Sequence, residues 1–231
     1  MSGSQASDLV IFGASNILSD IFDCAHALGL RITKVVLMME ETVGPRDKSL
    51  ADRIADFGRL GHSPIIQSID AFEPQASERY ILGPTTPLRA AMADELHRRF
   101  GLAFTVLVHP SAYVSPLAEL GGGVFIGANS VIAPGVALGE HVFVNRGVTI
   151  GHDTRIGPFS RVQPGSNLGG LSRIGRGVTI GIGATLVERL QIGDHAFIGA
   201  GAVVLRDVEA NLLVFGAPAK VRKRLANPAG H

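Results

Sequence analysis

The chain has little cysteine and little net charge. Its 231 residues include a single cysteine, Cys24. One cysteine excludes a disulfide within the chain and is typical of proteins of the reducing cytosol, and we expect a buried thiol in a helix. The 21 Lys and Arg residues nearly balance the 20 Asp and Glu residues, which leaves a formal net charge of +1. That balance indicates neither a nucleic-acid partner nor an anionic membrane surface.

Long apolar segments are also missing. No run approaches the roughly 18 consecutive apolar residues of a membrane-spanning helix. The first eight residues are polar and rich in serine, and they lack the basic and apolar regions of a signal peptide. We therefore expect a cytoplasmic protein without membrane insertion.

Glycine is distributed unevenly along the chain. It is sparse up to about residue 105 and dense from Gly121 to Gly216, whereas charged and helix-forming residues show the opposite trend. His109-Pro110-Ser111 interrupts the pattern between the two regions. We therefore expect two domains, residues 1–107 and residues 108–231, the second with a C-terminal tail.

Apolar strands and amphipathic helices alternate in the first region. The expected strands are 9–12, 32–39, 65–66 and 80–82, with 104–108 closing the unit, and the expected helices are 17–28, 51–60 and 88–100. Residues 42–48 have the composition of a loop. The alternation predicts a small Rossmann-like α/β domain with a parallel sheet, whose ligands would bind at the carboxyl ends of the strands.

The second region contains a repeat of six residues. Stepping by six from Val108 to Val204 meets 17 residues, all of them aliphatic, and glycine often follows them. A helix has 3.6 residues per turn and a plain strand alternates with period two, so neither explains this spacing. Three short strands joined by three corners do explain it, because the aliphatic residues then point inward and stack from one 18-residue coil to the next. The sequence therefore predicts a parallel β-helix.

Three motifs connect the chain to a known family: Val108-His109-Pro110-Ser111-Ala112, Val144-Asn145 followed by Ile150-Gly151-His152-Asp153, and Gly216-Ala217-Pro218-Ala219-Lys220. With the repeat, they resemble the left-handed β-helix hexapeptide-repeat acyltransferases. The α/β domain in front is similar to one subfamily, the bacterial sialic acid O-acetyltransferases and N-acetyltransferases of nucleotide-linked 4-amino sugars. The resemblance covers about residues 8–225.

The resemblance implies a function as well as a fold. It implies a left-handed parallel β-helix with a short C-terminal helix, acetyl-CoA as the acyl donor, and a homotrimer with active sites in clefts between neighbouring β-helices. The first domain would bind a sugar or nucleotide-sugar acceptor, and the reaction would serve polysaccharide or glycan biosynthesis.

His152 and Asp153 are the candidate catalytic residues. His152 follows the inward Ile150 by two residues, which places it at an exposed corner, where a neutral imidazole could take a proton from an attacking amine or hydroxyl. It also matches the histidine of the subfamily motif. Asp153 could hold the imidazole in the required tautomer. The alternatives are a surface histidine without a role and a solvated aspartate of a turn.

Donor binding is assigned by the resemblance. It places Gly170 and Ile182 along the pantetheine arm of acetyl-CoA, with Ala200 and Gly201 further along. Asn145 corresponds to an asparagine near the active cleft, although it could merely stabilise a turn.

Two basic positions extend the donor site. Arg161 stands where the subfamily often has a second histidine, and it could bind a phosphate or polarise the thioester oxygen; it could equally be a solvated surface residue. Lys220 opens a basic cluster that includes Arg222 and Lys223 and could meet the phosphates of CoA. The alternative is the basic face of an ordinary C-terminal helix.

The acceptor would bind at the loops of the α/β domain. Backbone N–H groups of Gly13-Ala14-Ser15, before a helix, could bind a nucleotide or an acidic group. Glu40 follows the second strand, where the subfamily has acidic residues, and Gly83 follows the fourth strand. Asn16-Ile17 replaces the Gly-His pair that the subfamily usually has here.

A zinc enzyme is one rival function for a β-helix of this kind. The γ-class carbonic anhydrases use the same β-helix with a zinc ion, but His141 and His195 lie three coils apart, roughly 14 Å at the strand spacing of about 4.8 Å, too far to share a metal. We therefore expect no metal.

A non-catalytic β-helix scaffold or sugar-binding protein remains the alternative of another class. Sialic-acid-type O-acetylation remains open beside N-acetylation of a nucleotide-linked 4-amino sugar, which we favour because an amine is the better nucleophile. We expect direct attack on the thioester, since no cysteine or serine is placed to form an acyl-enzyme.

Overall fold

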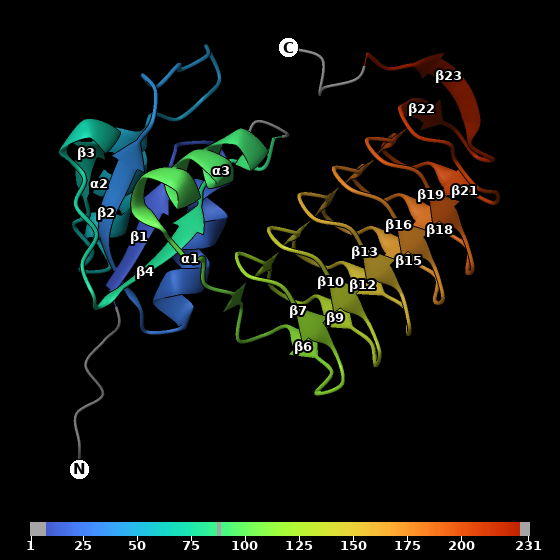
Figure 1. The fold of residues 1–231 in the computed structure, drawn as a ribbon, viewed down its shortest axis with the longest axis horizontal. Helices are drawn as coiled ribbons and strands as arrows, with labels where there is room; N and C mark the ends of the chain where they lie inside the picture. Colours follow the sequence, from blue (N-terminus) through green and yellow to red (C-terminus); the bar gives the residue numbers. More distant parts are fainter. Residues whose placement is uncertain (1–7, 87–88, 227–231) are drawn as a thin grey trace. The chain divides into compact units, whose positions relative to one another are not determined.

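The computed structural model describes residues 8–86 and 89–226. It divides into two compact units, Met1–Thr105 and Val106–His231. The first unit contains helices and a sheet, and the second is a stack of short strands (Figure 1). The predictions made for residues 1–7 and for Leu88 lie outside the described residues.

The first unit is built on a parallel four-stranded sheet, as the alternation of strands and helices predicts. Its order is β3-β2-β1-β4, with β1 (Asp8–Phe12), β2 (Arg31–Leu37), β3 (Ile65–Ser68) and β4 (Glu78–Leu82). The predicted closing strand 104–108 is wrong. Phe104 makes only an isolated parallel bridge to Tyr80, and Leu107 and Val108 instead form the first strand of the second unit.

Helices α1 (Leu18–Ala27) and α2 (Leu50–Gly58) and a short 3-10 helix, η1 (Ile69–Ala71), connect these strands. Helix α1 buries Leu18, Ile21, Phe22 and Ala25 at helical spacing, as the sequence predicts. Helix α2 begins after Ser49, whose Oγ accepts a hydrogen bond from the Asp52 N–H, a standard N-cap. Helix α3 (Arg89–Phe100) follows the last of the strands and ends the unit.

Cys24 lies on the buried face of α1, and burial raises the pKa of its thiol to about 12. Only about 10⁻⁴ of the thiol would be ionised near pH 8, and the thiolate is the reactive form. We expect no measurable reaction of the folded protein with an aromatic disulfide reagent and one thiol per chain after unfolding in guanidinium. Stoichiometric reaction of the folded protein would contradict the buried position.

The second unit has the predicted six-residue period. Strands β5 to β21 are each two residues long and begin six residues apart. In the register, Ile150 pairs with Ile132 and Leu168, so one coil contains 18 residues. The inward aliphatic residues form one core cluster through all the coils. This confirms the parallel β-helix.

The strands form three sheets. The eight-stranded sheet contains β5 (Leu107–Val108), β8 (Phe125–Ile126), β11 (Phe143–Val144), β14 (Arg161–Val162), β17 (Thr179–Ile180), β20 (Phe197–Ile198), β22 (Leu212–Phe215) and β23 (Lys220–Arg224). The six-stranded sheet contains β6 (Tyr113–Val114), β9 (Val131–Ile132), β12 (Thr149–Ile150), β15 (Asn167–Leu168), β18 (Thr185–Leu186) and β21 (Val203–Val204). The five-stranded sheet contains β7 (Glu119–Leu120), β10 (Ala137–Leu138), β13 (Arg155–Ile156), β16 (Arg173–Ile174) and β19 (Gln191–Ile192).

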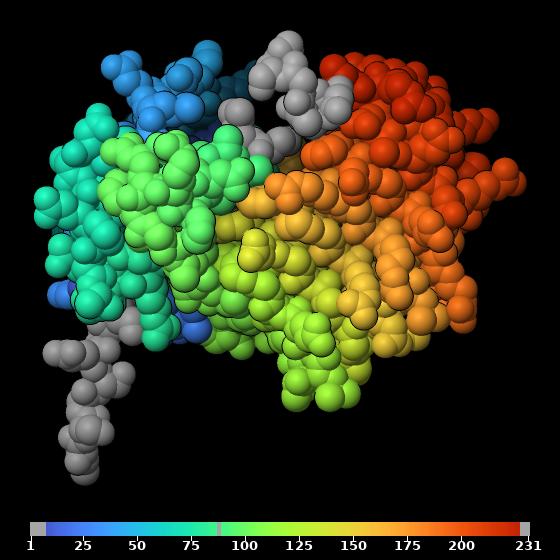
Figure 2. Space-filling view, viewed as in Figure 1, coloured from blue at the N-terminus to red at the C-terminus, as the bar shows by residue number. Residues whose placement is uncertain are grey.

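Glycine after the inward residue lets adjacent coils approach closely. A Cβ placed on Gly151 would lie 2.5 Å from the backbone nitrogen of Gly170 in the next coil, which is far inside van der Waals contact. Side chains of successive coils, coloured green to red, form a continuous surface on the face shown in Figure 2. A larger side chain at Gly151 would therefore displace the next coil.

The predicted short C-terminal helix is wrong over residues 220–224. Strands β22 and β23 form an antiparallel hairpin, and β22 pairs with β20. Strand pairing satisfies the backbone groups that the last coil would otherwise leave open, and Pro218 in the connection cannot donate a helical hydrogen bond. The basic cluster therefore lies on an exposed strand.

Candidate active site

His152 and Asp153 lie in the turn between β12 and β13, where the chain passes from the six-stranded to the five-stranded sheet. The His152 Nδ1 and an Asp153 carboxylate oxygen are 2.9 Å apart, and both side chains are 59% exposed. Neighbouring side chains can meet here because Asp153 has a left-handed backbone with φ 55°. An ionised carboxylate only accepts hydrogen bonds, so Nδ1 donates and Nε2 keeps a lone pair for a proton.

Gly170 lies one coil beyond His152 on the same edge. A Cβ on Gly170 would lie 3.0 Å from both Cδ2 and Nε2 of the imidazole, so the ring packs directly on the glycine backbone. Leu171 N–H also donates to the His152 carbonyl oxygen at 2.8 Å. The structure thus brings together His152, Asp153 and Gly170 out of the residues that the sequence proposed for catalysis and donor binding.

The other predicted groove residues lie on a different edge, between the eight-stranded and six-stranded sheets. Ile182, Ala200 and Gly201 are exposed in turns of this edge. Asn145 is buried there, and its side-chain oxygen accepts a hydrogen bond from the Arg146 N–H at 2.8 Å. Both edges border the six-stranded sheet, which separates them by strands two residues long.

The two basic positions of the predicted donor site lie elsewhere. Arg161 points outward from β14 in the eight-stranded sheet, and its Nε donates to the Thr179 hydroxyl at 3.0 Å. Burial lowers the pKa of its guanidinium. Lys220 is exposed on β23. Within one chain, neither residue shares an edge with His152.

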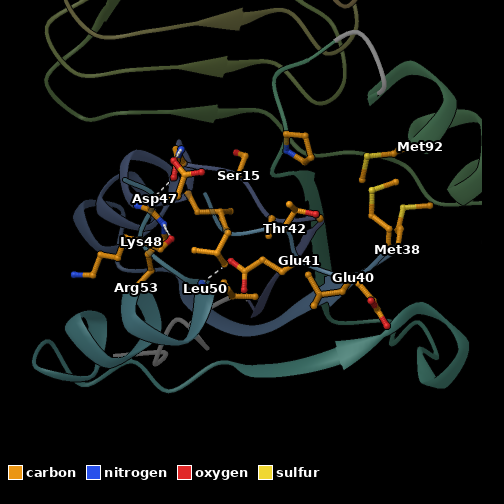
Figure 3. Close-up of a pocket in the computed structure, with 18 residues that line it drawn as sticks. Ser15, Met38, Glu40, Glu41, Thr42, Asp47, Lys48, Leu50, Arg53 and Met92 are labelled. Atoms are coloured by element: carbon orange, nitrogen blue, oxygen red, sulfur yellow. Dashed lines mark hydrogen bonds between the residues drawn. The ribbon is translucent and has the colours of Figure 1, made fainter. Parts of the chain in front are cut away.

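The first unit contains a pocket of about 260 Å³ beside the carboxyl ends of β1 and β2. Gly13, Ala14, Ser15 and Glu40 line it, as the sequence proposed. Met38 and Met92 lie at one end, and Asp47, Lys48 and Arg53 lie at the other (Figure 3). Gly83 is not in the lining. It lies behind the loop, where its carbonyl oxygen accepts a hydrogen bond from the Ser15 hydroxyl at 2.9 Å.

A polar network that the sequence did not predict holds the charged end of this pocket. Arg53 donates to the side chains of Asn16 and Ser19, both at 2.6 Å. Asn16 in turn donates to Asp47 at 2.7 Å. The hydrogen bond from Asn16 is the main cause of the lowered pKa of the Asp47 carboxyl, and a hydrogen bond from the Gly44 N–H lowers it further. Asn16, one of the residues that replaces the subfamily's Gly-His pair, therefore links the loop to α2.

Within residues 8–86 and 89–226, no three His, Cys, Asp or Glu side chains are grouped closely enough to hold a metal ion. None of the helices in the same ranges is long and apolar enough to cross a membrane.

Comparison with known families identifies the repeat. The family model of the bacterial transferase hexapeptide, six repeats, matches residues 117–152 and 172–206. No curated protein sequence matches the chain.

Solved structures match the chain over nearly its whole length. The acetyltransferase domain of PglB from Neisseria gonorrhoeae FA1090 is 27% identical, with 94% of this chain and 100% of that domain covered and a TM-score of 0.79. The same domain in complex with acetyl coenzyme A gives a TM-score of 0.78. A GDP-perosamine N-acetyltransferase variant from Caulobacter crescentus, bound to CoA and GDP-perosamine, shares the fold at 24% identity, with 94% and 97% covered and a TM-score of 0.79.

Proposed function

We propose that this chain, which belongs to the bacterial hexapeptide-repeat acetyltransferases, transfers the acetyl group of acetyl-CoA to the amino group of a nucleotide-linked 4-amino sugar. The observation that carries the proposal is the exposed His152–Asp153 pair packed on Gly170. The likeness to an acetyltransferase domain that binds acetyl coenzyme A supports the donor. The motifs shared with the subfamily of sugar acetyltransferases support a sugar acceptor, and an amine is favoured over a hydroxyl because it is the better nucleophile.

His152 acts as the general base in the proposed mechanism. Its Nε2 takes the proton from the sugar amine as the amine nitrogen forms a bond to the thioester carbonyl carbon. Asp153 stabilises the resulting imidazolium through Nδ1. When the carbon–sulfur bond breaks, the imidazolium returns the proton to the departing thiolate. The acetyl group passes directly from donor to acceptor, without an acyl-enzyme.

The donor would lie along the β-helix. Gly170 would leave room for the pantetheine arm beside the imidazole. The exposed turn residues Ile182, Ala200 and Gly201, which lie on the same edge as Asn145, would contact the arm from a neighbouring subunit. Lys220 would meet the phosphates of CoA, since its strand is exposed and basic. Arg161 and Asn145 lie on other faces and edges than His152, so they would join the site only through a neighbouring subunit.

A homotrimer would bring such edges together, with each active site in a cleft between two β-helices. Exposed apolar side chains on the outer face of the six-stranded sheet, among them Tyr113 and Val131, support self-association, because exposed apolar patches commonly mark interfaces. We place the enzyme in the cytoplasm, in polysaccharide or glycan biosynthesis.

The pocket of the first unit would bind the nucleotide of the acceptor. Backbone N–H groups of Gly13-Ala14-Ser15 would face its phosphates, and the Glu40 carboxylate would accept hydrogen bonds from ribose hydroxyls. Met38 and Met92 offer a polarizable apolar wall for the base.

Release of the CoA thiol from acetyl-CoA tests the proposal. The wild-type protein is assayed with UDP- and GDP-linked 4-amino sugars, with the matched 4-hydroxy sugars, and with free sialic acid. We expect thiol release with at least one 4-amino sugar and none with its 4-hydroxy counterpart, and the buried Cys24 leaves the assay with little background. Turnover of sialic acid alone would replace the proposal by O-acetylation. No turnover and no binding of acetyl-CoA by calorimetry would leave a scaffold or sugar-binding protein.

A further inference from the structure

The turn that carries His152 and Asp153 is held from both neighbouring coils. Asp153 N–H donates to the Pro134 carbonyl oxygen at 3.0 Å, and Leu171 N–H donates to the His152 carbonyl oxygen. A side chain adds a third bond, because the Arg173 guanidinium donates through Nη1 to the Asp153 carbonyl oxygen at 3.0 Å. This bond joins the pair to the five-stranded sheet of the next coil.

The hydrogen bond from Arg173 stabilises the backbone conformation of Asp153 in which the His152–Asp153 pair forms. Asp153 has a left-handed φ of 55°, which aspartate tolerates better than most residues other than glycine, and the hydrogen bonds from the neighbouring coils hold the backbone there. If the Asp153 peptide rotates, its carboxylate moves away from the imidazole, since the two residues are adjacent in sequence. Hydrogen bonds from a charged donor are stronger than those from a neutral one.

We propose that Arg173 is a positioning residue for the His152–Asp153 pair. It fixes the carbonyl group of Asp153 and thereby keeps the carboxylate within hydrogen-bond distance of Nδ1. The functional part of this inference rests on the proposed acetyl transfer, whereas its geometric part does not.

Arg155 provides a matched control on the same surface. Arg155 and Arg173 are direct partners in the register of β13 and β16, and both are exposed. Among the described residues, Arg155 makes no side-chain hydrogen bond or ion pair. The two arginines therefore share strand position, charge and exposure, and differ in the bond to Asp153.

The kinetic test compares three variants of the full-length protein in the CoA thiol assay. Arg173→Ala should lower kcat by about tenfold, because small misplacement of catalytic groups is costly, and should leave the KM for acetyl-CoA within about twofold. Arg173→Lys should recover most of the loss, since it keeps a charged donor. Arg155→Ala should stay within about twofold of wild type in kcat. An equal loss in Arg155→Ala, or wild-type kcat in Arg173→Ala, would overturn the proposal.

A double-mutant cycle shows whether Arg173 acts through Asp153. Arg173→Ala should cause no further loss of kcat in an Asp153→Ala background, because coupled residues give non-additive effects. Fully additive losses would refute the positioning role.

A crystal structure of Arg173→Ala provides a readout that needs no activity. The contact between the Asp153 carboxylate and Nδ1, 2.9 Å in the wild type, should be lost. If it persists, the inference fails whatever the reaction is. If it is lost while wild-type protein turns over no acceptor, the proposed function fails and the geometric inference stands.

Discussion

Replacing His152 with asparagine is expected to lower kcat for acetyl transfer by about 10²–10⁴-fold, the usual contribution of a general base. Asparagine is similar in size to histidine but cannot take up a proton near neutral pH. Its side chain can occupy the same exposed position above Gly170, so binding of acetyl-CoA should change by no more than a few-fold. A loss confined to kcat indicates a group that acts in the transition state.

Two measurements separate chemistry from binding in this variant. Steady-state release of the CoA thiol gives kcat, and calorimetry with acetyl-CoA gives the affinity of the donor. His195→Asn is the matched control, because His195 also lies in a β-helix turn and has a left-handed φ of 58°, which asparagine tolerates. We expect the control to keep its kcat within about twofold.

Two results would contradict the role of His152. If His152→Asn keeps wild-type kcat, the amine loses its proton to another group, and the exposed pair is a surface feature of the turn. If kcat falls equally in His195→Asn, the loss reflects damage to the β-helix and says nothing about a base.

The β-helix could be predicted from the sequence because its signal is local and periodic. Inward residues such as Ile150 recur every six positions, and glycine often follows them. The same period placed His152 at an exposed corner, and the structure has it there. The C-terminal strand could not be predicted in this way, because residues 220–224 are paired by a partner strand, β22, and by no pattern of their own.

Among the site residues, those related by the repeat could also be predicted, and those brought together by tertiary packing could not. His152 and Gly170 are 18 residues apart, so one coil length brings them together. Arg173 lies 20 residues after Asp153, which is one coil plus the two residues from the turn into the strand, and the period could have revealed it. Asn16 and Arg53 have no such signal. They meet across 37 residues through the packing of two helices, which only the three-dimensional structure shows.

Substitution of two isoleucines close together in the β-helix should have very different effects on stability. Ile180 points inward and is 1% exposed, whereas Ile182, two residues later, is 60% exposed in the next turn. Ile180→Ala removes buried methyl groups and leaves a cavity between coils, which should lower the free energy of unfolding by about 2–5 kcal/mol. Ile182→Ala removes groups that already face water, so its effect on stability should stay within about 0.5 kcal/mol.

Ile180→Ala should therefore change stability more than donor affinity, and Ile182→Ala should change donor affinity more than stability. Chemical unfolding of both variants measures stability, and calorimetry with acetyl-CoA measures the donor. We expect Ile180→Ala to bind acetyl-CoA like the wild type under conditions where it is folded. Ile182→Ala should bind it several-fold more weakly, because an apolar contact with the pantetheine arm is lost. If Ile182→Ala binds normally, the donor does not run along this edge. Equal destabilisation by both substitutions would mean that the turn, and not only the inward column, is part of the core.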